Sequence, residues 1–350
     1  MKKLFKIIAI INMLLNKMLA SIFNIISLMG VSYLLSYDYK KNLFNNNLPV
    51  KNVIITEYSK ENSCNGLVLS GGGSFGAYQN GVVSRLLHFN KKYWDVYSGV
   101  SSGSINAVYL SQFSNNENDI NDIFDNIIEM EHLWSSFKNN QLYNDEFFLN
   151  GLSLYNTKPL INTLKQNFNN LIIKNKLFIS STNVNQAKKI IWDENMVQKN
   201  MINSIMASTA LPFILNPIVI KGEYHVDGGL SSNILLEEVI DYCSKISKNI
   251  NIDVVLSSPF TEKNNKLRKH NTIIEYYYNL YNTITTVLMY NQLQNLENYL
   301  DILKISKKNI NITIYERNGL DEFNHIDFEK GNILWNKGFN LENTKITNYL

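Results

Sequence analysis

Long apolar runs, not alternating positions, dominate the first part of the chain. From Met18 to Ser36 the sequence is almost wholly apolar, and a shorter apolar run broken by Lys6 precedes it. About 20 such residues suffice to cross a bilayer. We therefore expect residues 1–37 to form a hydrophobic segment that associates with a membrane. The alternatives are a signal peptide, whose cleavage would give a secreted protein, and a helix packed on the folded domain.

Further along the chain, short apolar runs alternate with stretches in which apolar residues recur at helical spacing. Residues 38–63 are polar and rich in Asn, which predicts a tether. Gly66 to Ser70 reads as a buried strand, and the apolar positions from Ala77 to Leu87 recur at helical spacing. A second strand at 93–98 precedes a second helix at 104–110. This alternation predicts a three-layer α/β fold, in which helices flank a largely parallel central sheet.

Composition narrows the class of protein without naming a partner. Hydrophobic residues make up 45% of the 350 residues and charged residues 18%, which favours a folded protein with a sizeable core. The formal net charge of +3 is too small and too dispersed to indicate a nucleic-acid surface. Cys64 and Cys243 lie far apart without metal-ligand spacing, so we expect two free thiols.

A glycine-rich loop follows the first strand and opens the first helix. Its candidate binding residues are Gly71, Gly72, Gly73, Ser74 and Gly76. Such a loop directs backbone N–H groups at one small volume, where they stabilise an anion. A dinucleotide pyrophosphate is one candidate anion, but no acidic residue follows on a second strand about 20 residues later.

The next loop contains the pattern G-x-S-x-G from Gly99 to Gly103, between the second strand and the second helix. That context is the one a nucleophile elbow requires, with Ser101 held on a strained turn. Gly99 and Gly103 are expected to be glycines because side chains there would collide with the neighbouring strand and helix. A hydroxyl needs a base to take its proton, so Ser101 requires a partner.

Asp227 is the candidate base. It sits at a strand end before Gly228 and Gly229, which places a carboxylate in a tight loop at the mouth of the sheet. An Asp-Gly turn with a solvated carboxylate is the ordinary interpretation of this pattern. The strand end favours the catalytic interpretation, because the carboxyl ends of strands in such sheets gather at one edge.

These three blocks resemble the patatin-like phospholipase family in order, spacing and surroundings. The similarity extends to Gly76-Ala-Tyr-Gln, Ser102-Gly-Ser-Ile-Asn-Ala, Ala207-Ser-Thr-Ala-Leu-Pro and a late helix from Asp327 to Gly338. It covers roughly residues 64–340, which we therefore expect to form the catalytic domain.

The resemblance implies a lipid acyl hydrolase of the phospholipase A type that uses a Ser/Asp dyad, without metal or cofactor. Ser101 would attack the ester carbonyl and form an acyl-enzyme, and Asp227 would accept the proton. Backbone N–H groups of the glycine loop, chiefly Gly72 and Gly73, would hold the oxyanion. The partners implied are a phospholipid or other lipid ester and a membrane surface. Transfer of the acyl group to an alcohol, and lipid binding without turnover, stay open as alternatives.

Four other residues and one long segment complete the expectations. Phe75 stands where many relatives carry Arg or Lys, and we expect this to affect headgroup preference. A Ser-His-Asp triad would need His270 or His325, but both read as surface or boundary residues, and His225 receives no role. The stretch 271–305 predicts a helix whose wide apolar face packs in the core, with an acyl-chain channel or a membrane-facing lid as alternatives.

Overall fold

A computed structural model describes residues 63–90, 93–113, 120–142, 152–259, 273–305, 308–320 and 323–349. Within this part of the chain, nine strands form one sheet. They are β1 (Ser63–Leu69), β2 (Val96–Val100), β3 (Lys176–Asn183), β4 (Lys188–Asp193), β5 (Ile218–Ile220), β6 (Glu223–Asp227), β7 (Asn249–Leu256), β8 (Asn309–Arg317) and β9 (Thr344–Tyr349).

The centre of the sheet is parallel and its margins are antiparallel. Strands β3, β2, β1, β7 and β8 pair in that order and all run in the same direction. Strand β9 pairs antiparallel with β8, and β4, β5 and β6 form the antiparallel margin at β3. Every residue of β2 is buried, as expected for a parallel strand covered on both faces.

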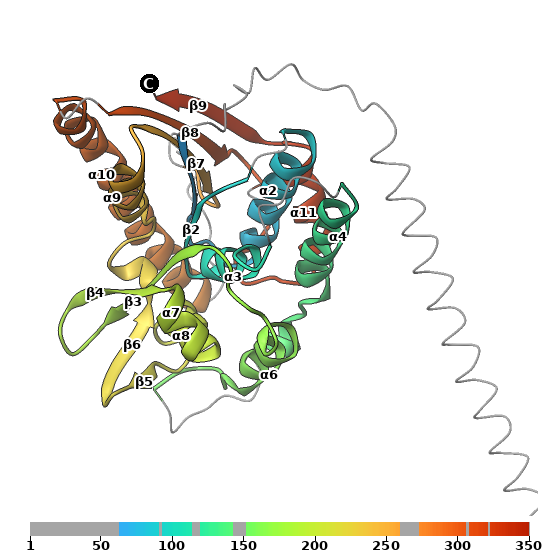
Figure 1. Ribbon diagram of the computed structural model, residues 1–350. Helices are drawn as coiled ribbons and strands as arrows, with labels where there is room; N and C mark the ends of the chain where they lie inside the picture. Colours follow the sequence, from blue (N-terminus) through green and yellow to red (C-terminus); the bar gives the residue numbers. More distant parts are fainter. Residues whose placement is uncertain are drawn as a thin grey trace, which may run out of the picture. The chain divides into compact units, whose positions relative to one another are not determined.

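Helices cover both faces of the sheet. They are α2 (Gly76–Asn90), α3 (Ser102–Leu110), α4 (Ile120–Ser136), α5 (Asn139–Leu142), α6 (Lys158–Phe168), α7 (Glu194–Lys199), α8 (Met201–Thr209), α9 (Leu236–Ile246), α10 (Ile273–Ile305) and α11 (Gly331–Phe339). Figure 1 shows α9 and α10 on one face of the sheet and α2, α4 and α11 on the other. The predicted three-layer α/β fold is therefore confirmed.

One edge of β3 carries two different strands in succession. Along this edge Val100 of β2 pairs with Ser180, and Asp227 of β6 pairs with the next residue, Ser181. Strand β4 occupies the opposite edge of β3. Because β2 runs parallel to β3 and β6 runs antiparallel to it, the carboxyl ends of β2 and β6 meet head to head. The fold thus brings the residues that follow these two strands to one place.

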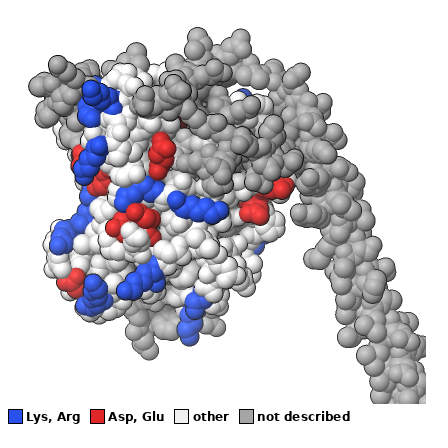
Figure 2. Space-filling model, viewed as in Figure 1, with Lys and Arg blue, Asp and Glu red and all other residues white. Residues whose placement is uncertain are grey.

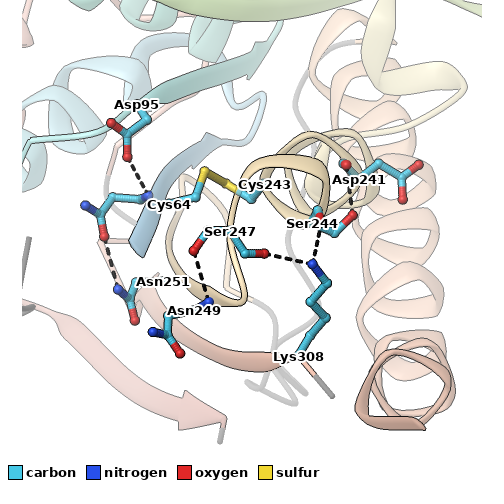
Figure 3. The surroundings of a disulfide bond; sticks show 10 residues. Cys64, Asp95, Asp241, Cys243, Ser244, Ser247, Asn249, Asn251 and Lys308 are labelled. Atoms are coloured by element: carbon cyan, nitrogen blue, oxygen red, sulfur yellow. Dashed lines mark hydrogen bonds between the residues drawn. A yellow bond between two sulfur atoms is a disulfide. The ribbon is translucent and has the colours of Figure 1, made fainter. Parts of the chain in front are cut away.

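An apolar cluster lies between the sheet and the helices α9 and α10, and a disulfide bond crosses it. Cys64 of β1 and Cys243 of α9 are bonded, with their Cα atoms 5.4 Å apart and both side chains buried (Figure 3). The prediction of two free thiols was wrong. The two cysteines are 179 residues apart in sequence, so no spacing pattern indicates the pairing that the stacking of α9 on β1 creates.

Two expectations concern residues that the structure leaves undescribed. The hydrophobic segment 1–37 lies outside the described residues, and so does the tether 38–63 except for Ser63. Among the helices that the structure describes, none is long and apolar enough to cross a membrane.

On the face drawn in Figure 2, basic and acidic side chains are interspersed, which agrees with the dispersed charge of the sequence.

The disulfide generates a stability prediction. Replacing both Cys64 and Cys243 with Ala should lower the free energy of unfolding by about 2–5 kcal/mol, because the bond closes a long loop in the unfolded chain. Chemical denaturation of the parent and the double variant measures the difference. In the unreduced, denatured parent a thiol reagent should find no reactive cysteine, and two reactive thiols there would contradict the bond.

Candidate active site

Ser101 lies at the junction between β2 and α3. It is the N-cap of α3, with φ 52° and ψ −125°, a backbone conformation that a non-glycine residue rarely adopts. The Ser101 N–H donates to the hydroxyl of Ser208 at 3.0 Å, and the Ser101 carbonyl accepts from Ser104 N–H at 2.9 Å. These contacts hold the strained turn that the G-x-S-x-G pattern predicts.

The two glycines of that pattern permit close contact between elements. A Cβ atom on Gly99 would lie 2.1 Å from the carbonyl oxygen of Gly103. A Cβ atom on Gly103 would lie 2.5 Å from the carbonyl oxygen of Leu69, at the end of β1. The expected collisions are present, so α3 can lie against the ends of β1 and β2 only when both positions are glycine.

Asp227 lies beside Ser101. The Ser101 hydroxyl donates to Asp227 Oδ2 at 2.6 Å, and the Gly229 N–H donates to Oδ1 at 2.8 Å. Gly228 and Gly229 begin the short 3₁₀ helix η2 (Gly228–Leu230), and the Asp227 carboxylate caps it. Because a Cβ atom on Gly228 would lie 2.5 Å from the carbonyl oxygen of Ser180, the tight turn depends on that glycine.

Burial sets the protonation behaviour of Asp227. The side chain is only 2% exposed, and loss of hydration raises the pKa of this carboxyl to about 6. The hydrogen bonds from Ser101 and Gly229 act in the opposite direction. The buried hydroxyl of Tyr281 lies near the same carboxylate, but it makes no hydrogen bond with any residue that the structure describes. A carboxylate with a pKa near 6 suits a general base at neutral pH.

The glycine loop faces the Ser101 side chain. Gly73 has φ +60°, and a Cβ atom there would lie 2.2 Å from the carbonyl oxygen of His325. Gly71 N–H is used internally, since it donates to Asn233 Oδ1 at 3.2 Å, and Ser74 N–H donates to the His325 carbonyl at 2.7 Å. Within the described structure, the N–H groups of Gly72 and Gly73 donate to no protein acceptor. These two donors are therefore available to an anion.

His325 supports this loop from behind. The expectation that it is a surface or boundary residue was wrong, because it is 5% exposed and lines the site. Its Nδ1 lies 3.1 Å from the Gly72 carbonyl oxygen and its Nε2 lies 2.6 Å from Asn282 Nδ2. These contacts hold its ring against the loop and do not include Ser101 or Asp227. The geometry thus gives no Ser-His-Asp arrangement through His325.

His225 lies apart from the residues that line the site. His225 Nδ1 lies 3.0 Å from the Ser181 hydroxyl, and its ring packs against Trp192. His270 lies outside the described residues. No cluster of metal-binding side chains occurs in the part of the chain that the structure describes.

Phe75 points away from the site. Its ring is buried, lies edge-on to His325 at a centroid distance of 4.6 Å, and has the Arg317 guanidinium 3.8 Å above it. The ring does not line the cavity at Ser101. The expected effect of Phe75 on headgroup preference therefore lacks a direct contact, and a cation from β8 already lies behind the loop. Sequence reasoning missed Arg317 because nothing near it in the chain resembles a motif.

A largely apolar cavity opens in front of Ser101. It encloses about 840 Å³ of empty space, including the part open to solvent. The glycine loop and the Ser101–Asp227 pair form part of its lining. Helix α10 contributes Tyr278, Tyr281 and Thr285. Apolar residues from other elements also line it, namely Ile105, Trp134, Phe137, Leu160, Leu211 and Ile214. Helix α10 therefore lines the site as well as packing in the core through Met289 and Leu293.

The buried carboxylate generates a prediction about stability. Because the pKa of Asp227 is raised to about 6 in the folded protein, folding favours the protonated carboxyl. The stabilisation that comes from this protonation is present at low pH and is lost as pH rises from about 4 through about 6. Asp227→Asn should therefore raise the free energy of unfolding by up to about 3 kcal/mol near pH 8. Urea denaturation at several pH values measures this.

A matched control is available in a second buried carboxylate. Asp253 is 2% exposed and accepts a hydrogen bond from the Trp94 indole at 2.9 Å, so Asp253→Asn should not stabilise the protein. The gain from Asp227→Asn should shrink below pH 6. A gain that is independent of pH would show that the buried charge is not its source.

Comparisons with known proteins indicate a family for part of the chain. Residues 67–240 match the sequence model of the family described as patatin-like phospholipase. A protein of Invertebrate iridescent virus 6, described as "Probable lipid hydrolase 463L", is 28% identical over 193 residues. That similarity covers 52% of this chain and 65% of the viral protein, so this chain spans less than two thirds of its relative's length.

A solved structure is also similar. The crystal structure of VipD from Legionella pneumophila is 14% identical, covers 84% of this chain and 73% of its own, and superposes with a TM-score of 0.37. The family assignment rests on the sequence match across β1, α2, β2, α3 and the Asp227 turn. Residues 67–240 form a patatin-like phospholipase domain.

Proposed function

We propose that this protein is a lipid acyl hydrolase in which Ser101 is the nucleophile and Asp227 the base. The observation that carries the proposal is the 2.6 Å hydrogen bond from the Ser101 hydroxyl to Asp227 Oδ2, inside an apolar cavity. Family membership and the similarity to a protein described as a lipid hydrolase support the choice of a lipid ester as substrate.

The proposed reaction uses these groups in two steps. Ser101 Oγ attacks the ester carbonyl carbon while its proton passes to Asp227. The carbonyl oxygen becomes an anion, to which the N–H groups of Gly72 and Gly73 donate. When the tetrahedral intermediate collapses, the C–O bond to the alcohol breaks and the proton on Asp227 passes to the departing oxygen. An acyl group is left on Ser101.

Water then releases the acyl group. Asp227 is again ionised and accepts a proton from a water molecule that attacks the acyl carbon, and the same N–H groups hold the second oxyanion. The fatty acid leaves and Ser101 recovers its proton. Since Asp227 must be ionised in both halves of the reaction, the rate should fall as pH drops below about 6.

The direct test is release of free fatty acid from phospholipid vesicles by the full chain. We expect turnover by the parent and a loss of at least about 10³-fold in Ser101→Ala and Asp227→Asn, because each variant removes one partner of the reacting pair. Products separated by headgroup identify the lipid class. Equal behaviour of all three proteins, with lipid bound but not cleaved, would leave a lipid-binding protein instead.

The glycine loop provides a second test. Gly73→Ala should lower kcat on a short-chain ester by about 10²-fold or more, because the added methyl group meets the His325 carbonyl and displaces an oxyanion donor. Gly222→Ala is the matched control, since Gly222 also has positive φ (+82°) but has nothing within 4 Å of the added atom. Both variants carry the backbone cost of positive φ, so an equal loss of kcat would contradict the oxyanion role.

A further inference from the structure

The outer face of α10 presents a stripe of large apolar side chains to solvent. We call the outer stripe the residues Tyr276, Leu280, Ile284, Val287 and Tyr290, which are exposed by 56%, 46%, 43%, 52% and 41%. Their spacing of three and four residues places them along one side of the helix. Scattered apolar residues are normal on a protein surface, but a continuous row along a helix is a feature of interaction sites.

The opposite side of the same helix covers the candidate active site. Tyr278, Tyr281 and Thr285 line the cavity that contains Ser101, and each of them is buried. At 100° per residue these three positions lie about half a turn away from the outer stripe. Helix α10 thus separates the cavity from the surroundings.

The outer stripe lies in a stretch without charge. Residues 276–295 include no Asp, Glu, Lys, Arg or His, although charged residues make up 18% of the whole chain. The exposed polar positions there are Thr and amide side chains. Tyr276 and Tyr290 stand at the two ends of the stripe, and tyrosine is enriched where a protein meets the headgroup level of a membrane. An uncharged face of this kind fits a lipid surface better than a protein partner recognised through paired charges.

A further exposed aromatic residue lies beside this helix. Phe213 is 67% exposed and has φ +60°, which is unusual for a bulky residue. The centroid of its ring lies 5.4 Å from that of Tyr277. The Tyr277 hydroxyl donates to the Pro212 carbonyl at 2.8 Å. Ile214, the next residue after Phe213, lines the cavity. The Phe213 turn therefore joins α10 to the rim of the candidate active site and adds an exposed ring there.

We propose that the outer stripe of α10, together with Phe213, docks on the surface of a lipid bilayer. This inference rests on the proposed function, because a lipid ester substrate resides in such a surface and must pass from it into the cavity beneath α10. The apolar side chains insert among the acyl chains, and the tyrosines remain at the headgroup level. Since the docking face is uncharged, its insertion is insensitive to salt and to the share of anionic lipid.

The test separates docking from turnover and from any binding by residues 1–37. In the full chain carrying Ser101→Ala, a nitroxide is attached to a single introduced cysteine, Leu280→Cys or Ile284→Cys. Labelling is confined to this site because Cys64 and Cys243 are bonded to each other. Paramagnetic relaxation by oxygen and by a water-soluble nickel complex then reports local depth in phosphatidylcholine vesicles, with and without phosphatidylglycerol.

We expect vesicles to decrease nickel access and increase oxygen access at both α10 labels, equally at low and high salt. Ile172→Cys and Val184→Cys are matched controls, because these apolar residues are exposed by 65% and 54% on other elements, and their labels should stay aqueous. Unchanged α10 labels, or equal burial of the control labels, would overturn the proposal. Labels already shielded without vesicles would show a protein segment or second copy on this face, which also overturns it.

Activity supplies an independent readout. Leu280→Gln combined with Ile284→Gln should lower the ratio of the rate on vesicles to the rate on a water-soluble short-chain ester by at least about tenfold. Ile172→Gln with Val184→Gln should leave this ratio unchanged. An equal loss on both substrates, or none, contradicts docking through α10. If the parent cleaves neither substrate, the proposed function fails, while the nitroxide experiment still decides the docking face.

Discussion

The site depends on one constraint, the succession of two strands along a single edge of β3. Ser180 pairs with the last residue of β2, and Ser181 pairs with Asp227 at the end of β6. The strands approach from opposite directions, so Ser101 and Asp227 come together although 126 positions separate them in sequence. A slip of β6 by one residue would turn the Asp227 side chain to the other face of the sheet. Pairing along β3 therefore fixes the distance between the Ser101 hydroxyl and the Asp227 carboxylate.

A second constraint holds the glycine loop in front of this pair. Gln79 Nε2 donates to the carbonyl oxygens of Ser70 and Val255, and so ties α2 to the ends of β1 and β7. Asn106 Nδ2 donates to Gln79 Oε1 and to the Gly76 carbonyl, which joins α3 to the same helix. These amides are fully buried and hydrogen-bonded, and a satisfied polar network of this kind favours one arrangement of the core. The loop that begins α2 and the turn that begins α3 are thereby held as one unit.

The parts of the site that could be predicted from sequence are those whose geometry is set by residues close together in the chain. Glycines, a serine and an aspartate in short motifs carry their geometry locally, because a turn with positive φ or a close helix–strand contact allows few residue types. Gln79 and Asn106 belong to the same short blocks. The strands and helices around these blocks were predictable for the same reason, since their periodicity is local.

Other parts of the site depend on contacts that no local pattern encodes. His325 reads as a boundary residue in the sequence, but the chain returns it to the glycine loop about 250 positions later. Arg317 is in a strand of ordinary composition and lies behind the glycine loop only because β8 brings it over Phe75. The Cys64–Cys243 bond likewise appears only once α9 packs on β1. Long-range packing creates all three, so sequence reasoning missed them.

The two ends of the sheet differ in what they carry. The candidate active site lies at the carboxyl ends of the strands, and the disulfide lies at the other end. At the carboxyl ends of the strands the protein tolerates two unfavourable features, a positive φ at Ser101 and a buried carboxylate at Asp227. At the amino end of β1, the disulfide joins an apolar cluster built from β7, β8, α9 and α10. Helix α10 belongs to both regions, because Met289 packs in that cluster while Tyr281 lies beside Asp227. Its anchored part can therefore hold its other part over the cavity, where a helix supported only by the site would not be stable.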